Sequence, residues 1–165
     1  MNLDEYALSL GGLHNNLTSL EFALRGYLYR RADPPHNPLP AGTLLLSLKV
    51  GDIVPQNALT DYSTLNLLID RYNKLVTPTH PELAVDPTIV DLRDALSHGR
   101  IIIYDSKQDM VLLKFSKPSS GRTSITYSQK LSLEWLHEQA GRVLDEVRKI
   151  VKAPGSPVGQ EFPID

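Results

Sequence analysis

The first thirty residues place leucines at steps of three, four and seven positions, which is the spacing of one face of an α-helix. These leucines are Leu3, Leu10, Leu13, Leu17, Leu20, Leu24 and Leu28. Gly11 and Gly12 interrupt the stripe. Because each glycine costs about 1 kcal/mol relative to alanine inside a helix, we expect a kink or a close helix approach there. The pattern predicts a long amphipathic first helix.

Prolines end this helix. Residues 32–42 (ADPPHNPLPAG) contain four of them, and since proline fixes φ and removes an amide donor, we predict an irregular connection. The apolar run that follows, residues 44–50 (LLLSLKV), fits either a short strand or a buried helical turn. Periodicity does not distinguish the two, and both remain open.

Two further helices are predicted in the middle of the chain. The second runs from about Asp61 to Val76, with Thr60 or Asp61 as its N-cap. Its apolar face consists of Leu65, Leu68, Ile69, Tyr72 and Leu75. The third begins at Asp86 and Pro87, because an aspartate side chain accepts free amides and proline is tolerated at the first helical position. Its buried face consists of Ile89, Leu92 and Leu96, and Gly99 is predicted to end it.

After Gly99 the helical period gives way to β-branched and aromatic runs, namely IIIY, MVLLKF and TSITY, separated by polar turn clusters. We predict a small antiparallel β-element over about residues 100–127. A helical period returns at Ser132. The apolar positions of this last helix are Leu136, Ala140, Val143, Leu144, Val147, Ile150 and Val151. Residues 153–165 are predicted to form a flexible tail.

These elements add up to a mainly α fold. We expect an up-and-down bundle of four to five helices with a small antiparallel β insertion before the last helix, because amphipathic helices of this length bury their apolar faces by bundling. A chain of 165 residues with 41% hydrophobic content fits one domain, which we assign to residues 1–152.

Composition excludes several classes of chemistry. The chain has no cysteine, so disulfides, thiolate metal sites and a cysteine nucleophile are excluded. We expect a soluble cytoplasmic protein, since no apolar run approaches the ~20 residues of a membrane span and the first residues lack signal-peptide features. The net charge of -2 provides no general attraction to nucleic acid. No metal or cofactor is expected, because four histidines fit no metal-binding spacing. These are His14, His36, His80 and His137.

The strongest candidate for chemistry is the pair Arg93 and His98 in the segment DLRDALSHGR, residues 91–100. Five residues correspond to roughly 140° on a helix, so the two side chains do not stack but can converge on one groove. A guanidinium binds phosphate oxygens, and an imidazole takes or gives a proton near neutral pH. His98 in the last turn is also favoured in its protonated form by the helix dipole. The pair therefore suits metal-independent RNA cleavage by attack of a ribose 2′-hydroxyl.

Spacing alone is weak evidence, because a chain of this composition is expected to contain roughly 0.3 accidental cases of an arginine followed by a histidine five positions later. Arg31 and His36 have the same spacing. Pro34 and Pro35 lie between them and cannot continue a helix, so only Arg93 and His98 have a structured setting.

The segment LRDALSHGRI resembles the signature of the HEPN superfamily: an arginine, a polar residue, apolar positions and a histidine. The resemblance implies a helical bundle, a homodimer whose paired motifs line a shared cleft, and a metal-independent endoribonuclease of toxin, antiphage or RNA-processing systems. It makes Arg93 and His98 the catalytic pair and Asp94 a supporting polar group. In toxins paired with a nucleotidyltransferase antitoxin, a modified tyrosine lies two residues after the histidine; this chain has Arg100 there and Tyr104 further on.

Other interpretations stay open at this point. Arg93 could form an ion pair with Asp91, Asp94 or another carboxylate that ties helices together, and His98 could simply cap its helix. Arg100 and Arg122 are candidate RNA-binding residues if the β-element folds over the site. A non-catalytic HEPN-like module that binds a partner or senses a ligand is the alternative function, and a helical structural protein with an accidental motif is the third.

Overall fold

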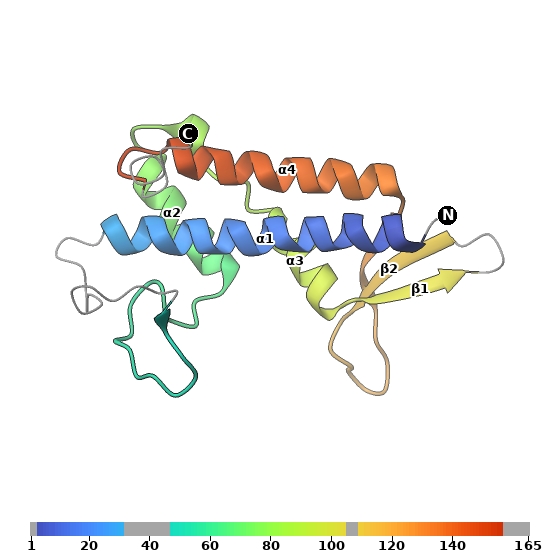
Figure 1. The fold of residues 1–165 in the computed structure, drawn as a ribbon. Helices are drawn as coiled ribbons and strands as arrows, with labels where there is room; N and C mark the ends of the chain where they lie inside the picture. The colour runs from blue at the N-terminus through green and yellow to red at the C-terminus, as the bar shows by residue number, and fades with distance from the viewer. Residues whose placement is uncertain (1–2, 32–46, 105–108, 157–165) are drawn as a thin grey trace. The chain divides into compact units, whose positions relative to one another are not determined.

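The computed structural model describes residues 3–31, 47–104 and 109–156 of the chain (Figure 1). The chain divides into two compact units. Unit 1 contains Met1–Ser19 and Asp86–Glu146, and unit 2 contains Leu20–Val85 and Val147–Asp165. The long helices α1 (Leu3–Arg31) and α4 (Leu133–Lys152) each contribute to both units. The prediction of a mainly helical fold with a small antiparallel sheet before the last helix is confirmed.

Helix α1 follows the leucine stripe only in part. Leu13, Leu17, Leu20 and Leu24 are buried as predicted, but Leu3 is 58% exposed. Of the kink or close helix approach expected at Gly11 and Gly12, the close approach is absent, because a Cβ atom at either position would meet no atom of another described element within 4 Å.

Unit 1 contains the sheet. Strands β1 (Arg100–Tyr104), β2 (Asp109–Phe115) and β3 (Ile125–Leu131) form an antiparallel sheet in the order β1-β2-β3 (Figure 1). The predicted β-element is confirmed, although β3 extends to Leu131. Alternate residues of β2 and β3 point to one face, where Met110, Leu112 and Leu131 are buried. The register places Lys114 of β2 opposite Tyr127 of β3, immediately before a bulge.

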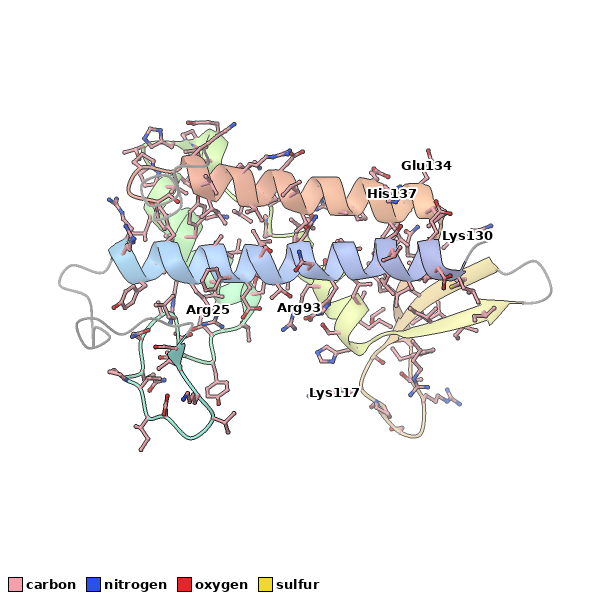
Figure 2. All side chains as sticks on the ribbon, viewed as in Figure 1. Arg25, Arg93, Lys117, Lys130, Glu134 and His137 are labelled. Atoms are coloured by element: carbon pink, nitrogen blue, oxygen red, sulfur yellow. The ribbon has the colours of Figure 1, made fainter. Side chains whose placement is uncertain are left out.

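Helices α1 and α4 meet in unit 1 through two polar contacts. The Asn16 side-chain amide donates to the Ala140 carbonyl at 2.9 Å. Ser9 Oγ lies 2.9 Å from Nε2 of His137, which is labelled on α4 in Figure 2. Helix α4 starts at Leu133, where the amide of Trp135 donates to Ser132 Oγ at 3.1 Å. Its buried stripe includes Leu136, Val143 and Ile150 as predicted, whereas Leu144 is exposed.

Unit 2 is organised around Tyr27 of α1 and Tyr72 of α2 (Leu65–Val76), whose buried rings meet edge to face with 4.9 Å between their centroids. The predicted N-cap of α2 is wrong: Thr64 caps the helix, not Thr60 or Asp61. Leu75, predicted to be buried, is 44% exposed, and the next residue, Val76, is buried instead. A short 3₁₀ helix, η2 (Pro81–Leu83), follows.

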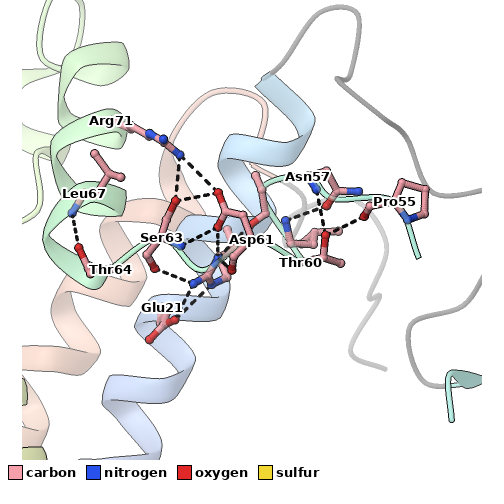
Figure 3. A network of polar contacts seen from close by, with 12 residues as sticks. Glu21, Pro55, Asn57, Thr60, Asp61, Ser63, Thr64, Leu67 and Arg71 are labelled. Carbon is pink, nitrogen blue, oxygen red and sulfur yellow. Dashed lines mark hydrogen bonds and ion pairs between the residues drawn. The ribbon is translucent and has the colours of Figure 1, made fainter. Parts of the chain in front are cut away.

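Arg25 holds the segment before α2 through several hydrogen bonds, and its partners Glu21, Asp61 and Ser63 are labelled in Figure 3. The guanidinium of Arg25 donates to the carboxylates of Glu21 and Asp61 and to the carbonyls of Ala58, Asp61 and Ser63, at 2.7–3.2 Å. Asp61 also accepts from the amide and the hydroxyl of Ser63. The carboxylate of Asp61 is therefore engaged by Arg25 and Ser63, which explains why α2 begins at Leu65.

Several predictions fall on or near residues outside the described ranges. The irregular connection at residues 32–42 and residues 44–46 of the open apolar run lie outside them. Residues 47–50 form no strand, and Val50 is fully exposed. In the predicted tail, Ala153 and Ser156 are buried, and residues 157–165 lie outside the description.

Candidate functional site

Helix α3 (Ile89–His98) in unit 1 carries the predicted pair. The carboxylate of Asp86 accepts hydrogen bonds from the backbone amide and the hydroxyl of Thr88, at 2.9 and 2.8 Å, as expected for a residue before a helix. The regular helix begins only at Ile89, after the predicted start at Asp86 and Pro87. Ile89 and Leu92 are buried as predicted. Ala95 is also buried, while Leu96 is only partly covered.

Gly99 ends α3 as predicted, but the physical reason is packing. Its φ of -78° is accessible to any residue, so no left-handed conformation is involved. A Cβ atom here would clash with the Ala95 carbonyl oxygen and lie 2.7 Å from Leu112 Cδ1 on β2. The absence of a side chain at Gly99 allows the end of α3 to lie directly against the sheet.

Arg93 is half-exposed and is labelled in Figure 2. Its Nη1 atom lies 3.3 Å from Asp94 Oδ1, so its ion-pair partner is Asp94, one of the two carboxylates expected from the sequence, and not Asp91. The other oxygen of Asp94 lies 3.6 Å from Nζ of Lys114 on β2. Asp94 therefore links Arg93 to a lysine of the sheet through two long, partly solvated contacts.

His98 lies in the last turn of α3 and is exposed. Within the described part of the chain its ring makes no hydrogen bond or ion pair. At 100° per residue, His98 lies within about 60° of Asp91 and Asp94 around the helix, whereas Arg93 is about 140° away from it. One face of α3 thus carries Asp91, Asp94 and His98 in line.

Beside this face is a polar pocket of about 180 Å³, which we call the Asp91 pocket; it is lined by Asp91, Lys114, Thr126 and Tyr127. Lys114 and Tyr127 reach it from paired positions on β2 and β3. Burial raises the pKa of the Tyr127 hydroxyl; the cation of Arg142 opposes that rise and the carboxylate of Asp91 adds to it. Tyr127 is therefore protonated at neutral pH and can donate a hydrogen bond.

Arg142 of α4 binds the residues that precede α3. Its guanidinium pairs with Asp86 at 2.8 Å and also donates to Thr88 Oγ1 and to the side chain of Gln139. Burial alone would raise the pKa of Asp86, but hydrogen bonds from Thr88 and Arg142 outweigh it and lower the pKa. The start of α3 is thereby fastened to α4.

A second hollow, of about 380 Å³, lies on the other side of α3 and is mostly apolar. It is lined by Ala7, Leu10, Gly11, His14, Leu96 and Ile101. Leu96 is three residues after Arg93 and shares its side of the helix. Helix α3 thus separates a polar pocket from an apolar hollow.

The two candidate RNA-binding arginines lie elsewhere in unit 1. The guanidinium of Arg100 lies over the Phe115 ring, 5.5 Å from its centroid, on the face of the sheet opposite to Lys114. Arg122 flanks the β2–β3 turn at Ser120 and Gly121, where its backbone pairs with Ser119. Neither makes a hydrogen bond or ion pair with Arg93, Asp94 or His98 in the described structure.

The described residues contain no group of three or more histidine, aspartate or glutamate side chains arranged to hold a metal ion. None of the described helices combines the length and apolar character needed to cross a membrane.

Sequence reasoning missed Lys114 and Tyr127 as parts of the site. A signal for Lys114 does exist: it follows Met110 and Leu112 at every second position of an otherwise apolar strand, so it belongs to the core-facing side. A lysine at such a position requires a polar partner. The identity of that partner depends on the pairing with β3 and the approach of α3, which no local pattern specifies.

Comparison of this chain with protein-family models, with curated proteins and with solved structures found no match. The site therefore has to be interpreted from its own residues and geometry.

Proposed function

We propose that this protein is a metal-independent endoribonuclease of the HEPN type, built as a helical bundle that acts as a homodimer. His98 is the general acid or base, Arg93 stabilises the charge that develops on the phosphate, and Asp94 orients Arg93. A toxin or antiphage effector restrained by an antitoxin or nucleotidyltransferase partner is the corresponding biological setting.

In the proposed reaction the ribose 2′-oxygen attacks the adjacent phosphorus and the bond to the 5′-oxygen breaks. A base removes the proton of the 2′-hydroxyl, and an acid protonates the leaving 5′-oxygen. The products are a 2′,3′-cyclic phosphate and a 5′-hydroxyl. His98 suits either proton transfer because an imidazole ring carries both a donor and an acceptor nitrogen, and the planar donors of Arg93 suit the phosphate oxygens.

The observation that carries this proposal is the availability of both side chains. His98 is exposed and has no partner in the described residues, and Arg93 is held only by a 3.3 Å contact with its neighbour. Exposed ion pairs of this kind contribute about 0–1 kcal/mol, and Asp94 contacts only one nitrogen of Arg93, so the other donors can bind a phosphate while that contact persists.

The test is cleavage of single-stranded RNA by the purified protein in the presence of a chelator. We expect cyclic-phosphate ends, and a loss of roughly 10²–10⁴-fold in rate for His98→Ala, the usual contribution of general acid–base catalysis. His80→Ala removes a histidine outside unit 1 and is the matched control. Undiminished cleavage by His98→Ala, or cleavage that requires a divalent cation, would contradict the proposal.

The second candidate is a non-catalytic HEPN-like module that binds a partner or senses a ligand. The net charge of -2 favours it, because a protein without a positive field attracts an RNA backbone weakly. This function predicts no cleavage by a wild-type protein freed of any partner, together with saturable binding that Arg93→Ala weakens.

A further inference from the structure

We propose that the Asp91 pocket binds a guanine base of the RNA substrate and so makes cleavage guanine-selective. This inference rests on the proposed ribonuclease function for its biological meaning, but the binding itself can be measured without cleavage.

The groups that line the pocket have unused hydrogen-bonding capacity. Among the described residues, the carboxylate of Asp91 and the hydroxyl of Tyr127 make no hydrogen bond or ion pair. Lys114 has only its 3.6 Å contact with Asp94. Elsewhere in unit 1 the carboxylate of Asp86 is bound by Arg142 and Thr88. The Asp91 pocket is therefore lined by a free acceptor on α3 and by two donors on β2 and β3.

The size of the pocket restricts what it can hold. Its volume of about 180 Å³ is below the roughly 300–1,000 Å³ of pockets that enclose drug-sized ligands. A single nucleobase fits this description better than a whole nucleotide, whose sugar and phosphate would remain outside.

The donor and acceptor pattern favours guanine among the four bases. The carboxylate of Asp91 can accept from both N1–H and N2–H₂ of guanine, while Lys114 Nζ donates to O6, which is the neighbouring acceptor. Tyr127 provides an aromatic surface and a hydroxyl donor in the same pocket. Adenine, cytosine and uracil each lack the pair of adjacent donors that a carboxylate binds with both oxygens.

The position of the pocket connects it to the proposed chemistry. Asp91 and His98 lie on one face of α3, and seven residues at 1.5 Å rise separate them by roughly 10.5 Å. Asp94 lies between them on that face and contacts Lys114. A base held beside Asp91 would leave its sugar and phosphate directed along this face toward His98.

The experiment is to titrate GMP, IMP, AMP, CMP and UMP into His98→Ala protein and to measure binding by calorimetry and by amide NMR. We expect GMP to bind at least ~10-fold more tightly than AMP, CMP or UMP, and IMP to bind more weakly than GMP because it lacks the N2 amine. Asp91→Asn in the same background should weaken GMP at least ~10-fold and remove its advantage over IMP, because one acceptor oxygen becomes a donor. Glu138→Gln, an exposed change on α4, is the matched control.

The outcomes separate this inference from the proposed function. Cleavage of RNA without guanine selectivity, equal affinity for the five nucleotides, or GMP binding that survives Asp91→Asn would overturn the pocket assignment and leave the ribonuclease proposal intact. Selective GMP binding lost in Asp91→Asn, in a wild-type protein that never cleaves RNA, would support the pocket and overturn the ribonuclease.

Discussion

Two arginine–aspartate pairs, Arg25 with Asp61 and Arg93 with Asp94, differ in almost every physical respect. Arg25 in unit 2 uses its guanidinium on two carboxylates and three carbonyls, and its side chain is 13% exposed. Arg93 in unit 1 has one contact of 3.3 Å with its neighbour Asp94 and is 38% exposed. The Arg25–Asp61 pair, which we call the saturated pair, has no hydrogen-bonding capacity left for a ligand. The Arg93–Asp94 pair, the loose pair, leaves most of the Arg93 donors free. This contrast separates an arginine that holds the fold from one whose donors remain accessible to solvent.

The pKa values of the saturated pair follow the same logic. Burial lowers the pKa of the Arg25 guanidinium, but its hydrogen bonds to Glu21 and Asp61 outweigh burial, and the pKa is raised. Burial raises the pKa of Asp61, yet hydrogen bonds from Ser63 and Arg25 outweigh that effect and the pKa is lowered. Both groups are therefore held in their charged forms.

The largest expected effect comes from breaking the saturated pair. Arg25→Ala should lower the free energy of unfolding by about 3 kcal/mol, because Asp61 loses a partly buried cationic partner and three carbonyls lose the donor that Arg25 provides. Arg93→Ala should change it by about 0–1 kcal/mol. Urea denaturation midpoints of the two variants measure the difference. Equal losses would show that the contrast between the two arginines has no energetic meaning.

The second prediction concerns the close approach that positions the site. Gly99→Ala should cost about 1–3 kcal/mol of stability, since its Cβ atom forces α3 and Leu112 apart. Gly141→Ala on α4 is the control: a Cβ atom there meets no described atom within 4 Å, so it should stabilise the helix by about 0.5–1 kcal/mol. Thermal unfolding of both variants tests this. An unchanged unfolding temperature in Gly99→Ala would show that α3 and β2 can move apart without loss of stability.

The smallest expected effect is that of acid. Asp61 and Asp86 both have lowered pKa values, so their contribution to stability is complete above the pKa of an unfolded aspartate, about 3.9. It is lost as the pH falls through the lower folded values. We expect the urea midpoint to fall on going from pH 6 to pH 3. Asp61→Asn should flatten this dependence, and an unchanged slope would show that Asp61 does not contribute.

Much of the fold could be predicted because its signals are local. The proline-rich segment, the leucine stripe of α1, the β-branched runs and the periodicity of α4 each depend on neighbours in sequence. The start of α2 could not be predicted, because Asp61 is a good N-cap by residue type but is bound by Arg25, which lies 36 residues earlier. Long-range hydrogen bonds of this kind override local propensity.

The residues of the candidate site also fall into those that local sequence can predict and those that it cannot. Arg93, Asp94 and His98 could be named because one short helix carries them all. Lys114 and Tyr127 could not, because their place beside Asp91 depends on strand register and on how tightly Gly99 packs on the sheet. Local motifs identify chemistry, whereas the selectivity of a pocket arises from residues brought together across the fold.

Each unit is built from segments that are far apart in the chain, and this affects synthesis on the ribosome. Unit 1 needs residues up to Glu146 of α4, and unit 2 needs the residues that follow it. Neither unit can be completed until its part of α4 has left the exit tunnel. A nascent chain that already displays α3 therefore still lacks Arg142, which fastens the start of that helix. In the proposed ribonuclease, this order of assembly would delay formation of the site until α4 has been translated.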